Sequence, residues 1–237
     1  MHTGARQGLT GMTRYAIYYT APAGPLADFG AAWLGWDVAT GTEPVPVVLD
    51  GLPIPRETIT ETPRKYGLHA TIKAPFRLAE GADIASLHQA FDAFCARHKP
   101  ATCPALAATP LGRFLALIPD GSSREIDALA GAAVTELDHL RAPLSEADRA
   151  RRMKSKLSPR HVELLDAWGY PHVLDAFRFH ITLTGRLPEE AVDATRAILA
   201  NAMHPLLPQP FVIDALSLCV EAENGRFRTL QRTALTG

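Results

Sequence analysis

Two segments of the chain repeat one short pattern, and this repetition restricts the possible folds more than any other feature. The stretches YGLHATIKAPF (66–76) and FRFHITLTGRL (177–187) carry the β-branched and aromatic residues that predict a strand. Each places a histidine two residues before a threonine. Because side chains alternate faces along a strand, the histidine and the threonine of each motif point the same way. The four residues are His69, Thr71, His180 and Thr182.

The same alternation extends both polar faces and leaves the opposite faces apolar. Lys73 continues the face of His69, and Arg178 and Thr184 continue the face of His180. The apolar faces suit packing against helices, whereas the polar faces suit a cleft better than an ordinary core. If an approximate two-fold axis relates the motifs, they face each other across that cleft.

The elements that follow each motif repeat in the same order. A helix, a strand, a turn and a second strand are predicted after each histidine, and both turns carry the tripeptide Gly-Arg-Phe. The predicted helices span 82–98 and 188–203, and the predicted strands span 102–109, 113–118, 211–221 and 226–233. The shared order, motif and turn indicate an internal duplication.

A segment over about 121–176 interrupts the duplication. Ser145 and Ser158 each precede a predicted helix, as N-cap residues do. A helical insertion that breaks the symmetry is a candidate lid or wall over the cleft. Its basic run RARRMKSK (149–156) fits a solvated helix face, which we favour, or a lid that touches a phosphate-rich substrate.

The segments before the first motif are predicted as a strand, a short helix and a loop, over 14–20, 24–36 and 37–63. The small, polar residues 1–13 are expected to be a disordered extension. Within them Met12 is a candidate native start, which the mass of the endogenous protein would test. Residues 14–237 are expected to form a single two-lobed domain.

Charge and cysteine usage argue against several classes of function. The 24 Lys and Arg residues nearly balance 25 Asp and Glu, and the chain therefore lacks the field that attracts long nucleic acids or anionic membranes. Three cysteines without a Cys-x-x-Cys motif argue against a disulfide framework and suit a cytoplasmic protein. No apolar run approaches the roughly 20 residues that a membrane-spanning helix needs.

The paired motifs suit acid–base chemistry on a phosphate. One histidine can deprotonate the attacking hydroxyl or water while the other protonates the leaving oxygen, and an unperturbed pKa of about 6.5 suits both tasks. Each threonine hydroxyl can donate a hydrogen bond to a non-bridging phosphate oxygen. We expect no metal and no cofactor. The assignment of base and acid between His69 and His180 is left open.

Cations and tyrosines near the motifs are candidates for substrate binding. Positive side chains can attract an anion, and a tyrosine can stack on a base or a ribose, although core packing explains a tyrosine equally well. Tyr15 and Tyr19 share one face of the first predicted strand, and Tyr18 lies on the other. Which of these faces lines the cleft is left open. The candidates are Lys73, Arg178, Arg14, Tyr15 and Tyr66.

Rival chemistries lack the residues they need. A metal site usually needs three protein ligands with carboxylates or thiolates among them, and neither motif contains one. The chain has no Gly-x-Ser-x-Gly elbow and no glycine-rich phosphate loop before a helix. Among the remaining histidines, only His172 in WGYPHV is kept as a neighbour of the site.

The HAT and HIT motifs resemble the signature of the two-histidine phosphoesterase superfamily, which includes RNA 2′,3′-cyclic phosphodiesterases and LigT-like RNA ligases. The resemblance implies an α+β fold with two pseudo-symmetric lobes. Each lobe is an antiparallel sheet with helices outside, and the active site lies in the central cleft. It also implies that His69 and His180 are the catalytic pair and that Thr71 and Thr182 bind phosphate.

A narrower resemblance covers nearly the whole chain from Arg14. The stretches RYAIYY, YGLHATIKAPF, FLALIP, RAPL, WGYPHV and FRFHITLTG are similar to those of a bacterial family of unknown function found near phosphonate-utilisation genes. This implies a role in phosphonate metabolism, on a ribosyl cyclic phosphate or a related intermediate.

We therefore expect a metal-independent phosphoric diester hydrolase that opens a cyclic phosphodiester in a small phosphorylated or nucleotide-like substrate. One alternative is an RNA-end enzyme of the 2′,3′-cyclic phosphodiesterase type. Another is a non-catalytic module that binds a nucleotide or a phosphorylated metabolite. The oligomeric state is left open.

Overall fold

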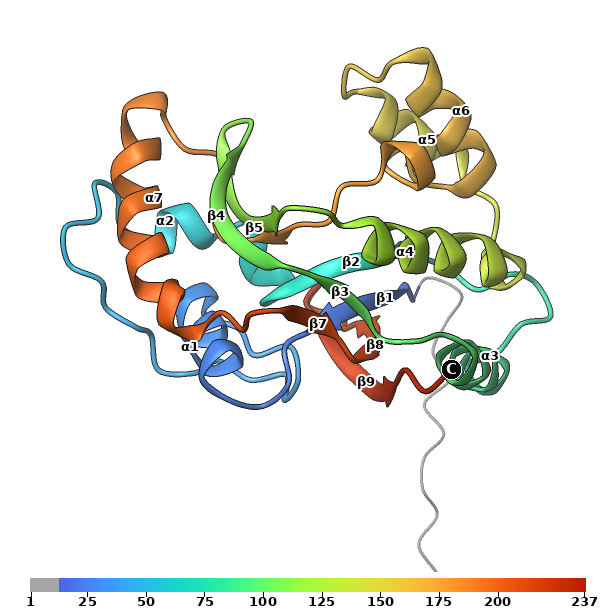
Figure 1. Ribbon diagram of the computed structural model, residues 1–237. Coiled ribbons are helices and arrows are strands. Elements are labelled where there is room, and N and C mark those ends of the chain that lie inside the picture. Colours follow the sequence, from blue (N-terminus) through green and yellow to red (C-terminus); the bar gives the residue numbers. More distant parts are fainter. Residues whose placement is uncertain (1–12) are drawn as a thin grey trace, which may run out of the picture.

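The computed structural model describes residues 13–237, and the expectations for residues 1–12 lie outside that range. Seven α-helices and nine strands form within the described part of the chain (Figure 1). The strands are β1 (Tyr15–Thr20), β2 (His69–Phe76), β3 (Ala101–Cys103), β4 (Ala105–Leu111), β5 (Phe114–Asp120), β6 (Ile181–Thr182), β7 (Phe211–Ile213), β8 (Ala215–Glu221) and β9 (Phe227–Ala234). The helices are α1 (Pro25–Leu34), α2 (Arg56–Thr60), α3 (Ile84–Arg97), α4 (Arg124–Glu136), α5 (Glu146–Met153), α6 (Pro159–Trp168) and α7 (Glu189–Met203).

Local sequence signals explain where several helices begin and end. The side chain of Asp83 accepts a hydrogen bond from the Ser86 amide, and Ser86 reciprocates, which forms a capping box at the start of α3. The hydroxyls of Ser145 and Ser158 cap α5 and α6 in the expected way. Gly169 ends α6 in the left-handed conformation, with φ of 75°.

The strands form an antiparallel α+β architecture with two pseudo-symmetric halves, as expected. Seven strands follow the order β4-β5-β6-β2-β1-β8-β9, and β3 pairs with β7 in a separate two-stranded sheet. Four local predictions were wrong. The stretch 37–63 contains the short helix α2, and the strand predicted over 177–187 is reduced to the two residues of β6. The single strands predicted over 102–109 and 211–221 are divided into β3 and β4 and into β7 and β8, which lie in different sheets.

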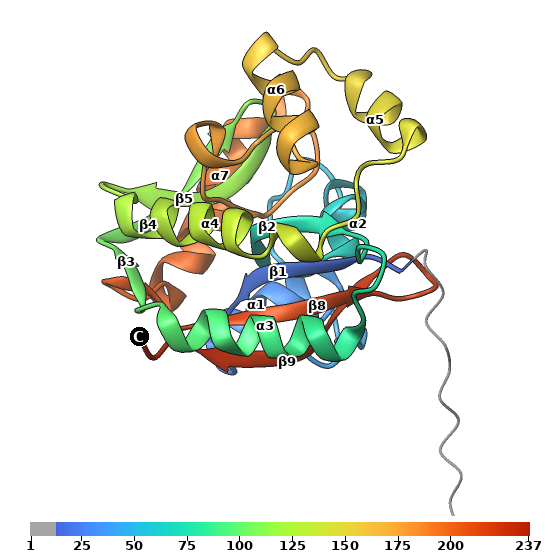
Figure 2. The same cartoon turned by 90° about the vertical axis from the view of Figure 1, so that its right-hand side faces the viewer.

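The two halves of the duplication are interlocked. The β4–β5 hairpin of the first half lies beside β6 of the second, and the β8–β9 hairpin of the second half lies beside β1 of the first. The helices follow the same exchange, since α3 packs against β8 and β9 while α7 packs against β4 and β5 (Figures 1 and 2). Each half therefore completes the core of the other.

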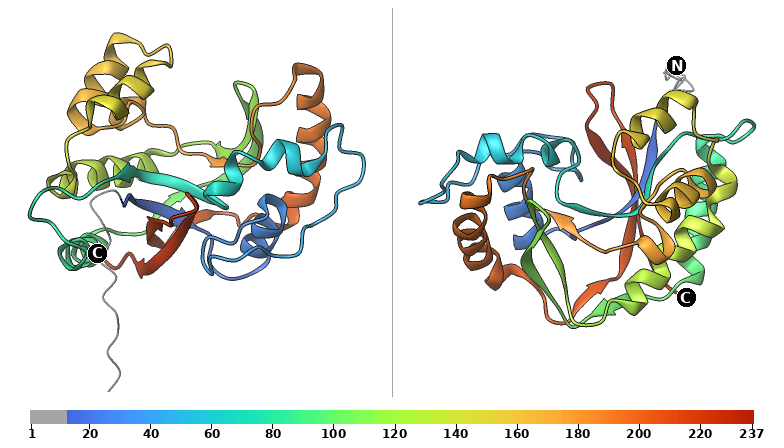
Figure 3. Two further views of the ribbon diagram at one scale, coloured as in Figure 1. Left: turned by 180° about the vertical axis from the view of Figure 1, so that it is seen from behind. Right: turned by 90° about the horizontal axis from the view of Figure 1, so that it is seen from above.

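The helices between the halves differ in their packing. Helix α4 lies against β2 and β3, whereas α5 and α6 stand together above the sheet, at the side of the molecule opposite α7 (Figures 1 and 3). The loop before α5 is hydrogen-bonded to the residue that follows β2, since the amide of Ala142 donates to the carbonyl of Arg77 at 2.8 Å. In the part of the chain that the structure describes, no helix is long and apolar enough to cross a membrane.

One buried hydrogen bond holds the irregular segment that follows His180. The indole Nε1 of Trp33 in α1 donates to the carbonyl oxygen of Leu183 at 2.7 Å, and both residues are fully buried. Trp33 thereby fixes backbone that leaves β6 after only two residues.

Trp33→Phe should destabilise the protein by about 1–3 kcal/mol, because it removes the donor from a buried carbonyl. Chemical denaturation would measure this change in the free energy of unfolding. Trp168→Phe is the matched control, since Trp168 is partly exposed and its effect should stay below about 1 kcal/mol. Equal effects of the two substitutions would contradict a structural role for the Trp33 hydrogen bond.

Candidate active site

The two histidine motifs meet at a single pair of residues in the sheet. Ala70 of β2 pairs with Ile181 of β6 in an antiparallel register. Continuing that register by one residue on each side sets His69 opposite Thr182, and Thr71 opposite His180. The four polar side chains therefore surround one backbone pair on the same face of the sheet. In a regular sheet such diagonal residues lie roughly 7–8 Å apart, which leaves room for a phosphate between the histidines.

Both imidazoles are oriented by the same backbone device. The Nδ1 of His69 donates to the carbonyl of Gly67 at 3.0 Å, and the Nδ1 of His180 donates to the carbonyl of Arg178 at 2.8 Å. A carbonyl oxygen can only accept, and each Nδ1 therefore carries a proton. In the neutral imidazole this leaves Nε2 as a proton acceptor.

Glycine at position 67 makes the first of these bonds possible. Gly67 has φ of 68°, a left-handed conformation that turns the chain into β2. A Cβ atom there would lie 3.1 Å from the carbonyl oxygen of Trp36 and 3.0 Å from the Cβ of Val38. A side chain at this position would therefore disturb the carbonyl that orients His69.

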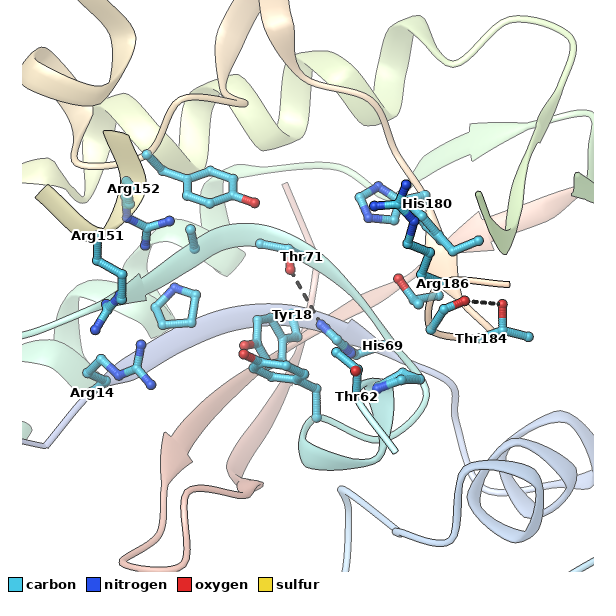
Figure 4. A pocket seen from close by; sticks show the side chains of 18 residues that line it. Arg14, Tyr18, Thr62, His69, Thr71, Arg151, Arg152, His180, Thr184 and Arg186 are labelled. Atoms are coloured by element: carbon cyan, nitrogen blue, oxygen red, sulfur yellow. Dashed lines mark hydrogen bonds between the residues drawn. The ribbon is translucent and has the colours of Figure 1, made fainter. Parts of the chain in front are cut away.

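The motifs open into a cleft of about 600 Å³. Figure 4 shows His69 and Thr71 in the middle of the cleft, His180 and Arg186 on one side, and Arg14, Arg151 and Arg152 on the other. The lining residues are Arg14, Tyr18, Thr62, Pro63, Tyr66, His69, Thr71, Ala74, Pro75, Phe114, Arg151, Arg152, Tyr170, His180, Thr182, Thr184, Gly185 and Arg186.

Aromatic rings surround His69. Its ring centroid lies 4.2 Å from that of Tyr18 and 5.5 Å from that of Tyr66. The pKa of His69 is lowered to about 4, chiefly by burial and to a smaller extent by the nearby His180, against the opposing effect of the bond to Gly67. His69 is therefore neutral near pH 7 while the cleft is empty.

Thr71 remains available to a ligand. Its hydroxyl oxygen lies 3.4 Å from the Nε2 of His69, a long and therefore weak hydrogen bond. Thr182 lines the cleft opposite His69, by the register described above. Thr184 is committed elsewhere, since its hydroxyl accepts from the Leu115 amide and donates to the Gly185 carbonyl.

The structure places Lys73 outside the cleft, contrary to its expected position. Tyr18 pairs with Thr71, but the preceding Ile17 pairs with Lys73, and β2 therefore carries an extra residue at this point. This bulge breaks the alternation, and Ala74 takes the place in the cleft lining. The Lys73 ammonium is instead buried under α4, where it donates to the carbonyl of Val134 at 3.0 Å.

Strand β1 faces the cleft with the side that carries Tyr18, and Tyr15 lies on the other side. Tyr15 is buried in the main core with Tyr19, and neither lines the cleft. Tyr18 lines it instead, fully buried, and among the described residues its hydroxyl has no hydrogen-bond partner. Sequence alternation separated the two faces but could not say which one the cleft would use.

The remaining sequence candidates are divided between two cavities. Arg14 and Tyr66 line the cleft, and Arg14 forms an ion pair with Glu221. Arg178 is exposed and lines an adjoining cavity of about 770 Å³, together with His172. The two cavities share Thr71 and His180, and the histidine pair therefore stands where they meet.

Several lining residues were not among the sequence candidates. The basic run at 149–156 is solvated in part, as Lys154 and Lys156 are exposed, but Arg151 and Arg152 reach the cleft. Tyr170 comes from the same insertion. Arg186 follows the second motif directly, and only its closeness to that motif could have indicated it. Within residues 13–237, no three His, Cys, Asp or Glu side chains gather as a metal site would require.

Comparison with known proteins identifies relatives of this chain. The profile of the family described as "Protein of unknown function (DUF1045)" matches residues 71–228. Two proteins named ribose 1,5-bisphosphate phosphokinase PhnN are 40% identical over 234 residues (Janthinobacterium sp., strain Marseille) and 36% identical over 213 residues (Laribacter hongkongensis, strain HLHK9). These alignments cover 95% and 90% of this chain but 51% and 49% of the relatives. The chain thus spans about half the length of the curated relatives it matches.

Solved structures resemble the chain more distantly. A phosphoesterase shares 16% identity with a TM-score of 0.43, and E. coli LigT in its apo form shares 18% with a TM-score of 0.42. Each comparison covers 95% of this chain, and 99% and 98% of the respective structures. At these values the likeness says nothing about activity or substrate.

NMR titration should find His69 protonated at Nδ1 and neutral down to about pH 4 in the free protein. Tyr66→Ala should raise the pKa of His69 toward 6.5, because water would then reach the imidazole and stabilise its charged form. The ¹³Cε1 and ¹⁵N chemical shifts would report both. A parent protein in which His69 titrates near 6.5 would contradict the buried, neutral state.

Proposed function

The chain belongs to the DUF1045 family of proteins of unknown function, and we propose that it is a metal-independent phosphoesterase that opens a cyclic phosphodiester by acid–base catalysis between His69 and His180. The observation that carries this proposal is the Ala70–Ile181 pair. It brings two histidines and two threonines around one point of the sheet, each histidine opposite the threonine of the other motif. Such a set matches the needs of a phosphoryl centre with an attacking and a leaving oxygen on opposite sides.

His69 acts as the general base in this mechanism. Its Nδ1 proton is held by Gly67, its Nε2 faces the cleft, and it is neutral near pH 7. Nε2 removes a proton from water as the water oxygen forms a bond to phosphorus. The lowered pKa makes an empty site a weak base, but a bound phosphate places negative charge beside the imidazole and raises the pKa again.

His180 acts as the general acid. As the imidazolium, with a proton on each ring nitrogen, it protonates the ester oxygen through Nε2–H as the bond between that oxygen and phosphorus breaks. The product is a phosphomonoester with one free hydroxyl. His69 then releases its proton to solvent and His180 takes one up, which restores the starting state. The hydroxyls of Thr71 and Thr182 donate to the non-bridging oxygens, and Arg186 beside His180 adds positive charge (Figure 4).

The relatives support a ribosyl phosphate as the substrate. They are named for a kinase of ribose 1,5-bisphosphate, and this chain aligns with about half of each. Activities on one polypeptide that act on connected intermediates would share the sugar, and a ribosyl cyclic phosphate suits the paired histidines. A place in phosphonate metabolism and a cytoplasmic location are part of the same proposal.

His69→Ala and His180→Ala should each lower kcat by about 100-fold or more on the substrate that the parent opens, since positioned acid–base groups contribute that order. The assay is a panel of nucleoside 2′,3′-cyclic, ribose 1,2-cyclic and ADP-ribose 1″,2″-cyclic phosphates, in EDTA. His204→Ala is the matched control, because His204 is exposed and outside the cleft. Turnover that requires added metal, or a folded histidine variant with parental kcat, would overturn the mechanism. Binding of panel members without turnover would favour a non-catalytic module.

The pH profile should carry the signature of His69. Because the base must be neutral, kcat/KM should fall as the pH drops through about 4, and not near 6.5. The acidic limb of kcat should lie at a higher pH than that of kcat/KM, since bound phosphate raises the pKa of the base. Steady-state kinetics between about pH 3.5 and 9, with the fold checked by circular dichroism, would measure both limbs. Coincident limbs near pH 6.5 would remove His69 from the role of base.

A further inference from the structure

The cleft extends beyond the histidine pair to an end rich in arginine. Figure 4 shows Arg14, Arg151 and Arg152 together, across His69 and Thr71 from His180 and Arg186. These three side chains come from distant parts of the chain: Arg14 precedes β1, and the other two lie on α5 of the insertion. The long-range convergence of three guanidinium groups on one end of a cleft is unusual, because like charges repel.

Nearby carboxylates neutralise only part of this charge. Arg14 pairs with Glu221, and Asp148 is shared between Arg77 and Arg151, at 2.5 and 2.7 Å. Within residues 13–237, Arg152 has no carboxylate partner, and its Nε is buried without a hydrogen bond. Four guanidinium groups therefore face two carboxylates, which leaves an excess of two positive charges.

Arg152 is held in place although it lacks an anion. Its guanidinium lies over the ring of Tyr170, 4.8 Å from the centroid. Burial lowers the pKa of Arg152, and the positive charges of Arg151 and Arg14 add to this effect, whereas Tyr170 and Asp148 oppose it. A half-buried cation beside other cations is costly unless a ligand supplies the missing negative charge.

A second unsatisfied donor lies between this end and the histidines. The hydroxyl of Tyr18 is fully buried, lines the cleft and has no partner in the described part of the chain. Arg14 is close enough to lower the pKa of this phenol, although burial raises it far more. An anionic ligand at the arginine end would give both Tyr18 and Arg152 an acceptor.

We propose that the arginine end, formed by Arg152, Arg14, Arg151 and the Tyr18 hydroxyl, binds a second phosphate of the substrate. The substrate is then a cyclic phosphodiester of a sugar that also carries a phosphomonoester. An excess of two positive charges matches the dianion of a phosphomonoester near neutral pH, and guanidinium groups bind phosphate through paired N–H donors. This inference rests on the proposed function for the identity of the reacting centre, but not for the existence of the second site.

The first test compares substrates that share the reacting centre and differ only in the second phosphate. Ribose 1,2-cyclic phosphate is paired with its 5-phosphate, and a nucleoside 2′,3′-cyclic phosphate with its 5′-phosphate. The parent should prefer the doubly phosphorylated member of a pair in kcat/KM by about 10- to 100-fold, the range of a charge-assisted hydrogen bond. Equal kcat/KM within each hydrolysed pair would overturn the proposal.

Substitutions test which residues cause the preference for the doubly phosphorylated substrate. Arg152→Gln should lose most of the preference, chiefly by lowering kcat/KM on the doubly phosphorylated member. Arg151→Gln, at an exposed side chain whose loss is tolerable to the fold, should lose part of it. Arg186→Gln should slow both members alike. Lys154→Gln, directly after the same helix but exposed and outside the cleft, should leave the parental values unchanged. A preference that survives in Arg152→Gln and Arg151→Gln would overturn the assignment.

A binding measurement separates this proposal from the proposed function. Ribose 5-phosphate has no cyclic phosphate, and calorimetry should find it bound by the parent and by the double variant His69→Ala, His180→Ala, but about 10- to 100-fold more weakly by Arg152→Gln. This result would support the second site even if no cyclic phosphate is hydrolysed. Binding that is lost in the double histidine variant and kept in Arg152→Gln would place the phosphate at the catalytic centre and overturn the proposal, as would no binding at all.

Discussion

The pairing of Ala70 with Ile181 is the constraint on which the rest of the structure depends. The strand β6 has only two residues, yet it joins the two halves of the sheet and fixes which residues of the motifs oppose each other. The motifs His-Ala-Thr and His-Ile-Thr differ only in the middle residue, which is Ala70 in one and Ile181 in the other. The histidine and threonine on either side of it therefore retain an approximate two-fold relation. Elements around the pair hold it in place, including the Leu183 amide that donates to Leu115 of β5 at 2.9 Å.

The cleft combines two different chemical environments. At the centre, aromatic rings and backbone carbonyls keep His69 uncharged and oriented, which suits proton transfer. Toward α5, charge dominates, and Arg152 is stacked on Tyr170 without an ion-pair partner among the described residues. The insertion that breaks the internal symmetry is therefore also what makes the two ends of the cleft chemically unequal.

Much of the fold was predictable because its signals are local. Capping residues marked α5 and α6, and the repeated order of helix and strands indicated the duplication. The misplaced residues have long-range causes. The bulge in β2 depends on its pairing with β1, and it removed Lys73 from the cleft. The choice between Tyr15 and Tyr18 depends on which face of β1 meets the main core. The basic run at 149–156 was only the less favoured candidate for a lid, and Arg152 could not be singled out within it, because the packing of the insertion, which no local pattern encodes, decides where its side chain points.

The exchange of hairpins between the halves has a consequence for how the protein is made. The lobe that carries His69 is completed by β8 and β9, which follow every other described element along the chain. During synthesis one edge of β1, beside the first motif, therefore stays uncovered until β8 and β9 have left the ribosome. Contacts so distant in sequence slow folding, and an open strand edge invites pairing with other chains. The interlocked architecture thus makes the nascent chain more dependent on protection from aggregation than a simple tandem of two independent lobes would be.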